Sequence, residues 1–509
     1  MEKEISLKGV MLRSSSLMIV ALGLGKVLGY LFHFVFVKTF SQEDYGSFVY
    51  AWSMALFLCG LLIPNIAASV TRYVAYFRGK SDEQKVSSAV RTGIILNTLL
   101  ILPAAALSYI LYAAGLLRMD AVSYAFVLSI MALNAIACLF SGIISGYRKP
   151  EVSALLNLVQ QGLRVAAIVA AALLAGSLHG IFSLVAFAFL IYALVVVAYE
   201  RRRYGFGLRW DGTLAKQMFT FGVFTVFYVT ANNILAWFDI FMIKYFMTDA
   251  DVAVYNAAWL ASTLNLVFFT SVLQIFSPVA AELFGAGKRE RLVKLTAYVL
   301  ETFFLLFLPI FMSTFLFARE ILTFFFKAEY AVGASALQVL SIGGFFTGIS
   351  LLFIELISAQ GKPKLNALNI GAGAALNALL NLIMIPAYGI LGAAFSTLVS
   401  SSVILALSYL QVKGIVRSSF SARRILKIVF SSSVAVAAVY VVKVLVAQSL
   451  LSLIISCVAL VSVYCILLLL LKGLRQEDVD LAQVAMEKAY VPAGMVKLAA
   501  QVLKSAVNR

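Results

Sequence analysis

The chain has 509 residues, of which 62% are hydrophobic, and its mean hydropathy is +0.99. Soluble domains carry a much smaller apolar share, so this composition indicates a polytopic membrane protein. The formal charge of +17 lies mostly in short segments between apolar runs, which is typical of membrane topology and not of nucleic-acid binding. The four cysteines lie singly inside apolar runs, which argues against a disulfide framework and a cysteine metal site.

Apolar runs of bilayer-spanning length predict an all-α fold with about fourteen transmembrane helices. The first run is longer than a signal peptide, is interrupted by Lys26 and lacks a small-residue cleavage site, so we expect it to remain. The predicted spans are residues 14–37, 45–70, 87–112, 120–144, 152–175, 180–199, 217–243, 253–278, 293–317, 332–358, 365–386, 389–411, 425–447 and 449–471.

The first span carries a lysine near its middle and a histidine two turns later. Lys26, Gly29 and His33 share one helical face, and Gly25 and Gly29 would let another helix or a ligand approach closely. A lysine at that depth costs about 2.5–3.5 kcal/mol on insertion scales, so it should face water or a partner. We therefore interpret this helix as one wall of a polar cavity in a transporter.

The loops between the spans differ in charge. Loops on one side hold most of the lysines and arginines, whereas the opposite loops hold few and include acids such as Asp249 and Asp251. The positive-inside rule then predicts that both termini lie in the cytoplasm. We expect the protein to lie in the plasma membrane.

Spans 1–12 read as a six-helix unit used twice, because residues 145–150 (SGYRKP) recur as 358–363 (SAQGKP) and other short matches keep the same order. Six is even, so both units have the same orientation in the membrane. The expected parts are an N-lobe (1–199), a cytoplasmic linker (200–216), a C-lobe (217–412), two further spans (413–472) and a tail (473–509). The tail is either an amphipathic helix on the inner leaflet or a solvated helix.

Span 7 and span 1 occupy equivalent places in the repeat, and both carry polar side chains. Tyr228, Asn232 and Asp239 lie on one face of span 7. The two faces either meet across a central cleft or form an internal pair, Lys26 or His33 with Asp239, that only neutralises buried charge.

Spans 5 and 11 carry amide stripes. Asn157, Gln161 and Arg164 share a face of span 5, and Asn377 and Asn381 lie on span 11. Amides in a bilayer need partners, so these side chains either bind substrate or hold neighbouring helices together. Arg164 lies near the middle of its span and keeps its charge, which favours a phosphate ligand over snorkelling to an interface.

Two further residues, Arg72 and Glu355, complete the predicted site. Arg72 either lines the cytoplasmic mouth or is an ordinary topology anchor, while Asp239 and Glu355 are candidates for ion coupling. Nucleotide-binding and hydrolase motifs are absent from the sequence, and its two histidines are too few for a metal site. We therefore expect neither catalytic residues nor a cofactor.

Several stretches resemble the polysaccharide biosynthesis family of oligosaccharide flippases, within the multidrug/oligosaccharidyl-lipid/polysaccharide exporter superfamily. They are 25–30 (GKVLGY), 41–46 (SQEDYG), 63–65 (IPN), 72–76 (RYVAY), Asp239 and 254–258 (VYNAA). The resemblance implies two six-helix lobes around a V-shaped central cavity. It also implies transport of a lipid-linked glycan from the inner to the outer leaflet, with a basic residue at the place of Lys26.

These observations predict a flippase for a polyprenyl-phosphate-linked oligosaccharide that acts by alternating access. A cation-coupled multidrug exporter of the same superfamily is the nearest alternative, and a membrane-embedded glycosyltransferase or ligase is an alternative of another class. The expected partners are the lipid-linked oligosaccharide and membrane lipid, with glycan-pathway enzymes as further candidates and no nucleic acid. We expect a monomer.

Overall fold

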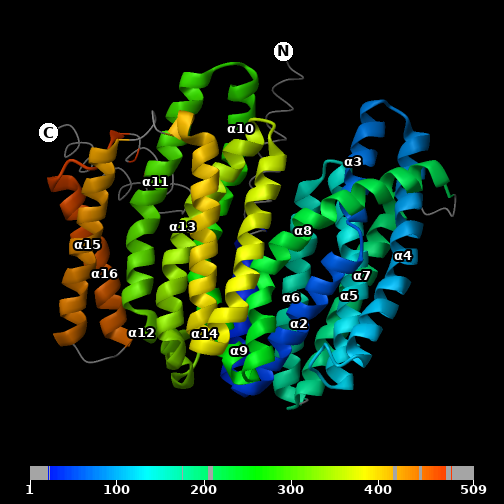
Figure 1. The fold of residues 1–509 in the computed structure, drawn as a ribbon, viewed down its shortest axis with the longest axis horizontal. Coiled ribbons are helices and arrows are strands. Elements are labelled where there is room, and N and C mark those ends of the chain that lie inside the picture. Colours follow the sequence, from blue (N-terminus) through cyan, green and yellow to red (C-terminus); the bar gives the residue numbers. More distant parts are fainter. Residues whose placement is uncertain are drawn as a thin grey trace. The chain divides into compact units, whose positions relative to one another are not determined.

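The computed structural model describes residues 21, 23–174, 176–204, 210–416, 421–445, 450–476, 478 and 483, and nearly all of them are helical (Figure 1). Residues 23–39 form the first helix. The others are α2 (Gln42–Leu62), α3 (Ile66–Gly79), α4 (Glu83–Ala113), α5 (Ala121–Gly146), α6 (Pro150–Leu174), α7 (Leu178–Tyr204), α8 (Gly212–Phe246), α9 (Asp249–Leu264), α10 (Leu266–Gly285), α11 (Arg289–Leu316), α12 (Ala318–Phe325), the 3₁₀ helix η1 (Ala328–Gly333), α13 (Ala334–Ala359), α14 (Pro363–Val416), α15 (Ala422–Leu445) and α16 (Leu450–Leu470).

The prediction of an all-helical, multi-pass membrane protein is confirmed. Within the described residues, ten helices are long and apolar enough to cross a membrane, and α14 alone contains both predicted spans 365–386 and 389–411. The number fourteen stays a prediction. So does the amphipathic tail helix, because residues 484–509 lie outside the described part of the chain.

Polar side chains fix where several helices begin. Asp120 accepts hydrogen bonds from the backbone N–H groups of Val122 and Ser123 at the start of α5, and Asp211 accepts one from Leu214 at the start of α8. A carboxylate at this position satisfies amide groups that the helix leaves unpaired and lies at the positive end of the helix dipole.

Two predicted spans are interrupted, and one long helix is bent. The span 45–70 is two helices, because Pro64 has no N–H to continue α2 and the Asn65 side chain starts α3 by accepting from Ala68 N. The span 253–278 breaks at Asn265, between α9 and α10. Inside α14, Gly389 has φ 60° and ψ −139°, which a residue with a side chain avoids.

The chain separates into two compact units that do not follow chain order. The first holds the described residues up to Leu260 together with Leu322–Ala336 and Ala367–Ser400, and the second holds Ala261–Ile321, Leu337–Asn366 and the described residues from Ser401 onward. The lobe boundaries expected from the internal repeat stay a prediction.

An aromatic cluster joins four helices of the first unit. The Phe48 ring on α2 lies with its centroid 5.4 Å from that of Phe32, 5.1 Å from Phe36, 5.7 Å from Phe126 and 6.2 Å from Phe182. These rings come from the first helix, α5 and α7, and tilted or stacked pairs at such distances add to the energy of burial. The cluster therefore fixes the first helix against α2, which matters for the site below.

A group of four charged residues, three of them buried, organises the second unit. Arg424 on α15 donates to Glu301 Oε2 on α11 at 2.5 Å and also to Asp478, while Arg475 Nη1 lies 2.8 Å from Glu301 Oε2. Two acids and two bases balance, which is the arrangement that buried charges require. Glu301 is thus paired with two arginines.

Gly46 on α2 touches the backbone at the start of α9. A Cβ added at Gly46 would lie 1.8 Å from the carbonyl oxygen of Asp249, and backbone atoms cannot give way as a flexible side chain can. We expect Gly46→Ala to destabilise the protein by about 1–3 kcal/mol or more, as overpacking does. The measurement is the melting temperature of the purified protein in detergent.

Gly162→Ala is the matched control for this substitution. Gly162 lies inside α6, and an added Cβ would meet nothing within 4 Å. Alanine is favoured over glycine within a helix by about 0.8–1 kcal/mol. The control should therefore melt at an unchanged or higher temperature, and equal melting of both variants would contradict the close approach of α2 to α9.

Candidate functional site

The polar face of α6 lies against the glycines of the first helix. A Cβ on Gly25 would be 3.0 Å from Asn157 Oδ1, and one on Gly29 would be 3.7 Å from Gln161 Oε1. The helix that approaches Gly25 and Gly29 closely is thus α6. Its Asn157 lies against Gly25, and its Gln161 lies against Gly29. Small residues permit this spacing between membrane helices.

Arg164 is a buried cation held by aromatic rings. Its side chain is 7% exposed, and its guanidinium carbon lies 4.5 Å from the Phe32 ring centroid and 4.3 Å from that of Trp52. Its Nη1 donates to Gln161 Oε1 at 3.1 Å. Cation–π contacts of this kind stabilise a desolvated arginine by about 2 kcal/mol.

The guanidinium of Arg164 nevertheless keeps unused capacity. A guanidinium has five N–H donors, and Nε is buried without a hydrogen-bond partner. Among the residues that the structure describes, no carboxylate forms an ion pair with Arg164. A buried charge that lacks a counter-ion favours an incoming anion.

His33 belongs to a hydrogen-bonded chain and not to an ion pair. Its Nδ1 lies 2.9 Å from the Tyr45 hydroxyl on α2, and that hydroxyl accepts from Asn256 Nδ2 on α9 at 2.8 Å. The hydroxyl is then free to donate its own proton to His33. The alternative of a pair between His33 and Asp239 is therefore not what the structure has.

The remaining predicted cations are more accessible. Lys26 and Arg72 are exposed, and the Arg72 guanidinium lies 4.6 Å from the ring centroid of Phe221 on α8. Their roles as substrate contact and mouth residue stay predictions.

Asp239 is the centre of a second polar cluster, built from α8, α9 and α14. The carboxylate accepts from Thr397 Oγ1 at 2.7 Å, from Asn381 Nδ2 at 2.5 Å and from the hydroxyl of Tyr255. Asn381 also donates to Asn377 Oδ1 at 3.1 Å. The structure thus brings together three predicted residues, Asp239, Asn377 and Asn381.

This cluster is buried and carries one uncompensated carboxylate. Asp239 is 3% exposed and Asn377 and Asn381 are 0% exposed. Within the described chain no basic side chain pairs with Asp239, and Asn381 Oδ1 has no donor. Neutral donors stabilise the carboxylate, but the clustered oxygens also suit a small cation or a proton.

Three other predicted residues lie outside these clusters. Asn232 donates its amide to the carbonyl oxygen of Tyr228 at 2.8 Å, so part of its hydrogen-bonding capacity is used within α8. The Tyr228 side chain is 43% exposed. Glu355 on α13 is half-buried and belongs to the second unit.

Sequence reasoning missed the hydroxyl and aromatic partners of these groups. Tyr255 and Thr397 bind Asp239, while Trp52 covers Arg164. Aromatic and hydroxyl residues are common in apolar helices, so they give no signal of their own. Residues 254–258 were noted only as part of a family resemblance.

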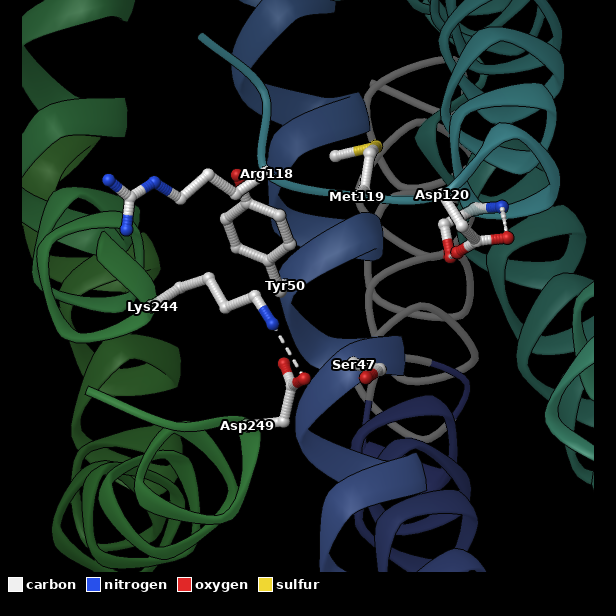
Figure 2. Close-up of a pocket in the computed structure, with 8 residues that line it drawn as sticks. Ser47, Tyr50, Arg118, Met119, Asp120, Lys244 and Asp249 are labelled. Carbon is white, nitrogen blue, oxygen red and sulfur yellow. Dashed lines mark hydrogen bonds and ion pairs between the residues drawn. The ribbon is translucent and has the colours of Figure 1, made fainter. Parts of the chain in front are cut away.

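A separate pocket of about 390 Å³ lies where α2, α5, α8 and α9 begin or end (Figure 2). Lys244 Nζ and Asp249 Oδ2 are 2.6 Å apart in it, and Arg118 donates to the Tyr245 carbonyl oxygen at 2.9 Å. Figure 2 shows Asp120 on the far side from this pair. The positive and negative side chains that line this pocket offset one another. None of the predicted site residues lines the pocket. The lining is Ser47, Tyr50, Arg118, Met119, Asp120, Ser123, Lys244 and Asp249.

A family profile described as "Polysaccharide biosynthesis protein" matches residues 11–284, which is more than half of the chain. This chain belongs to the polysaccharide biosynthesis protein family. A second profile, described as "MatE", matches residues 223–383.

Curated relatives of this family member match over part of their length. A probable low-salt glycan biosynthesis flippase of Haloferax volcanii, Agl15, is 23% identical over 189 residues, covering 37% of this chain and 40% of the relative. An uncharacterized membrane protein of Methanocaldococcus jannaschii is 27% identical over 189 residues, or 36% of each chain. The chain thus spans less than half the length of these relatives.

Solved structures establish the fold of this family member. The lipid II flippase MurJ in an inward closed conformation aligns with a TM-score of 0.72 at 16% identity, covering 89% of this chain and 97% of MurJ. An inward-facing multidrug resistance MATE transporter of the MOP superfamily aligns with a TM-score of 0.65 at 14% identity, covering 79% and 99%. The predicted MATE-like fold is confirmed.

The Tyr255 hydroxyl donates to a carboxylate, whereas the Tyr464 hydroxyl donates to the carbonyl oxygen of Leu305 at 2.7 Å. Hydrogen bonds to charged groups contribute about 1.5–3 kcal/mol and neutral ones about 0.5–1.5 kcal/mol. We expect Tyr255→Phe to lower the melting temperature of the purified protein clearly more than Tyr464→Phe, which removes the same atom. Equal losses would mean that Asp239 is not ionised in the folded protein.

Proposed function

We propose that this protein is a flippase that moves a polyprenyl-phosphate-linked oligosaccharide from the cytoplasmic to the outer leaflet, for the synthesis of cell-surface polysaccharide or glycan. Family membership and relatives named as glycan flippases support this activity. The fold shared with transporters also favours transport over a membrane-embedded glycosyltransferase or ligase.

The observation that carries the proposal is the unpaired guanidinium of Arg164. The headgroup of such a lipid brings negative phosphate into the membrane, and a desolvated phosphate needs a fixed cation. The aromatic clamp of Phe32 and Trp52 holds the charge in place before the ligand arrives. Lys26, on the neighbouring helix, is the proposed second phosphate contact, and Arg72 the contact at the cytoplasmic mouth.

The amides of the proposed site bind the sugar. Asn157 and Gln161 precede Arg164 on the same face of α6, while Asn232 and Tyr228 on α8 present further donors and acceptors to sugar hydroxyls. His33, whose ring is held by the Tyr45 hydroxyl, is a further proposed contact to the sugar.

Transport proceeds by alternating access of two six-helix lobes with the polyprenyl tail in lipid. The charge pattern of the loops supports cytoplasmic termini. The proposed protein is a monomer of the plasma membrane and works beside enzymes of its glycan pathway. An inside-negative potential favours outward movement of a negative headgroup by about 2.3 kcal/mol per charge per 100 mV.

Asp239 is the proposed site of a coupling cation, either a proton or Na⁺. Hard cations prefer oxygen ligands, and the carboxylate, Thr397 Oγ1 and the donor-free Asn381 Oδ1 lie together. Glu355 is the second candidate, although within the described residues no hydrogen bond or ion pair holds it.

Replacing Arg164 by glutamine should slow flipping by roughly tenfold or more, because each 1.4 kcal/mol of lost phosphate binding is a factor of ten. The assay follows a fluorescent polyprenyl-diphosphate oligosaccharide that reaches the far leaflet of reconstituted vesicles. Lys26→Gln is the second test variant, and Arg291→Gln, an exposed arginine at the start of α11, is the control. Wild-type rates in both Arg164→Gln and Lys26→Gln would refute the assigned roles.

A cation-coupled multidrug exporter is the second candidate function. The observation that favours it is Asp239, because a buried acid without a base also suits a cationic drug. Uptake of a fluorescent organic cation into the same vesicles discriminates the two. Drug transport that needs Asp239 but not Arg164, without flipping, would establish the exporter instead.

The role of Asp239 in coupling is tested by a gradient experiment. We expect an imposed Na⁺ or proton gradient to accelerate flipping by wild type and by Glu355→Gln, and to leave Asp239→Asn at the rate measured without a gradient. Glu290→Gln, an exposed acid at the start of α11, is the control. Acceleration that survives in Asp239→Asn but is lost in Glu355→Gln would move the coupling site to Glu355.

A further inference from the structure

A cavity of about 420 Å³ in the first unit lies at the break between α2 and α3. Helices α4, α5 and α8 supply its other walls, and its size is within the range of small-ligand sites. The lining residues are Leu56, Cys59, Gly60, Ile63, Pro64, Asn65, Ile66, Ala67, Asn97, Asn134, Ala135, Cys138, Val229, Asn233 and Trp237.

The lining is mostly apolar with amide groups set into it, and it carries no carboxylate, lysine, arginine or histidine. Four asparagines and one tryptophan provide its polar side chains, and they come from the α2–α3 break, α4, α5 and α8. An amide offers both donors and acceptors, while an indole offers one donor beside a large apolar face. This combination matches a ligand that alternates hydroxyl groups with C–H surface.

The amides of this cavity are only partly used by the protein. Asn97 Nδ2 donates to the Ala135 carbonyl oxygen at 3.3 Å, and Asn134 Nδ2 makes a long contact of 3.6 Å with Cys59 Sγ. In the described part of the chain, Asn233 forms no hydrogen bond with another residue. A membrane-depth amide with free capacity needs a polar partner, so the cavity is built to hold one.

The helix break contributes backbone acceptors as well. Pro64 has no N–H, so it leaves the carbonyl oxygen of Gly60 without the helical partner four residues on. Non-helical backbone at membrane depth is tolerated where it lines a polar cavity, and broken helices mark the binding sites of many transporters. Gly60 itself faces the cavity and leaves room for Asn233, to which an added Cβ would come within 2.3 Å.

We propose that this cavity is the subsite for the neutral, hydroxyl-bearing sugar part of the transported headgroup. The inference rests on the proposed flippase function and divides the headgroup between two places. Arg164 takes the phosphate, and the amides with Trp237 take a sugar residue. Tyr228 and Asn232 remain the proposed contacts for other sugar hydroxyls of the oligosaccharide. The cavity is lined by Val229, Asn233 and Trp237, which lie on another face of α8.

Other ligand classes fit this cavity poorly. A phosphate or an ammonium group would lose its water without meeting an opposite charge, which is costly. An alkyl or polyprenyl chain would leave the amides unpaired. A sugar satisfies both requirements, because its hydroxyls bond to the amides while its C–H face covers the indole ring.

Two native cysteines allow a test that needs no transport. Cys59 and Cys138 line the cavity, and Cys138 is exposed. In protein with Cys457→Ser and Cys465→Ser, we would measure the rate at which N-ethylmaleimide labels Cys138. The probes are mannose, galactose and N-acetylglucosamine at tens of millimolar, with sodium phosphate and glycine betaine at the same concentration as controls.

We expect at least one of these sugars to slow labelling of Cys138 by twofold or more, and phosphate and betaine to leave the rate unchanged. Asn233→Leu, which changes a lining residue on a different helix from Cys138, should abolish the protection, while Thr98→Val should keep it. Thr98 follows Asn97 on α4, but its exposed hydroxyl bonds to the carbonyl oxygen of Ile94 at 2.9 Å. Protection by none of the sugars, or by phosphate as well, would overturn the proposal.

Flipping assays separate this inference from the proposed function. If wild type flips the lipid-linked oligosaccharide and Asn233→Leu flips it equally fast, the sugar subsite is wrong and the flippase stands. If wild type flips no lipid-linked oligosaccharide, the flippase is wrong, and sugar protection of Cys138 still decides whether the cavity binds sugar.

Discussion

The buried carboxylate of Asp239, which has no basic partner among the described residues, determines how α8, α9 and α14 pack in the first unit. A buried carboxylate without a base requires several donors, and these come from α9 and from both arms of α14. Asn381 precedes the bend at Gly389 and Thr397 follows it, so one glycine lets both arms reach the same carboxylate. The cluster therefore couples three helices through one charge, and any change in that charge alters all three contacts.

Arg164 has the opposite charge and a different kind of support. Aromatic rings hold it in place without neutralising it, whereas the buried arginine of the second unit, Arg424, is fully paired with Glu301 and Asp478. The contrast within one chain is informative. Arg424 ties α11 to α15 and to the segment after α16, which is a structural task, while a guanidinium that the protein leaves unpaired is available to a ligand.

The sequence predicted the helical membrane fold and the charged residues inside the membrane helices. It did not predict which residues contact those charges. Hydropathy indicated helices, and an arginine or aspartate inside an apolar run stands out because its insertion is costly. What the pattern could not supply is which uncharged groups meet those charges. Tyr255 and Trp52 look like ordinary membrane-helix residues, and Asn233 differs from Asn232 by one position, which turns it by about 100° to another face. The repeat paired equivalent helices, but contacts such as that of Asn381 with Asp239 join helices that are not equivalent.

Two neighbouring residues on α9 connect the cluster around Asp239 to the surroundings of Arg164. Tyr255 donates to Asp239, and Asn256 donates to Tyr45, whose hydroxyl meets His33 beside Phe32. A cation or proton bound at Asp239 would weaken the hold of the carboxylate on Tyr255, and a shift of α9 would move Asn256 with it. Such a link transmits a change only if α9 has two stable positions. The contact of Gly46 with the Asp249 carbonyl oxygen fixes the start of α9, so a shift would pivot there and grow along the helix through Tyr255 and Asn256.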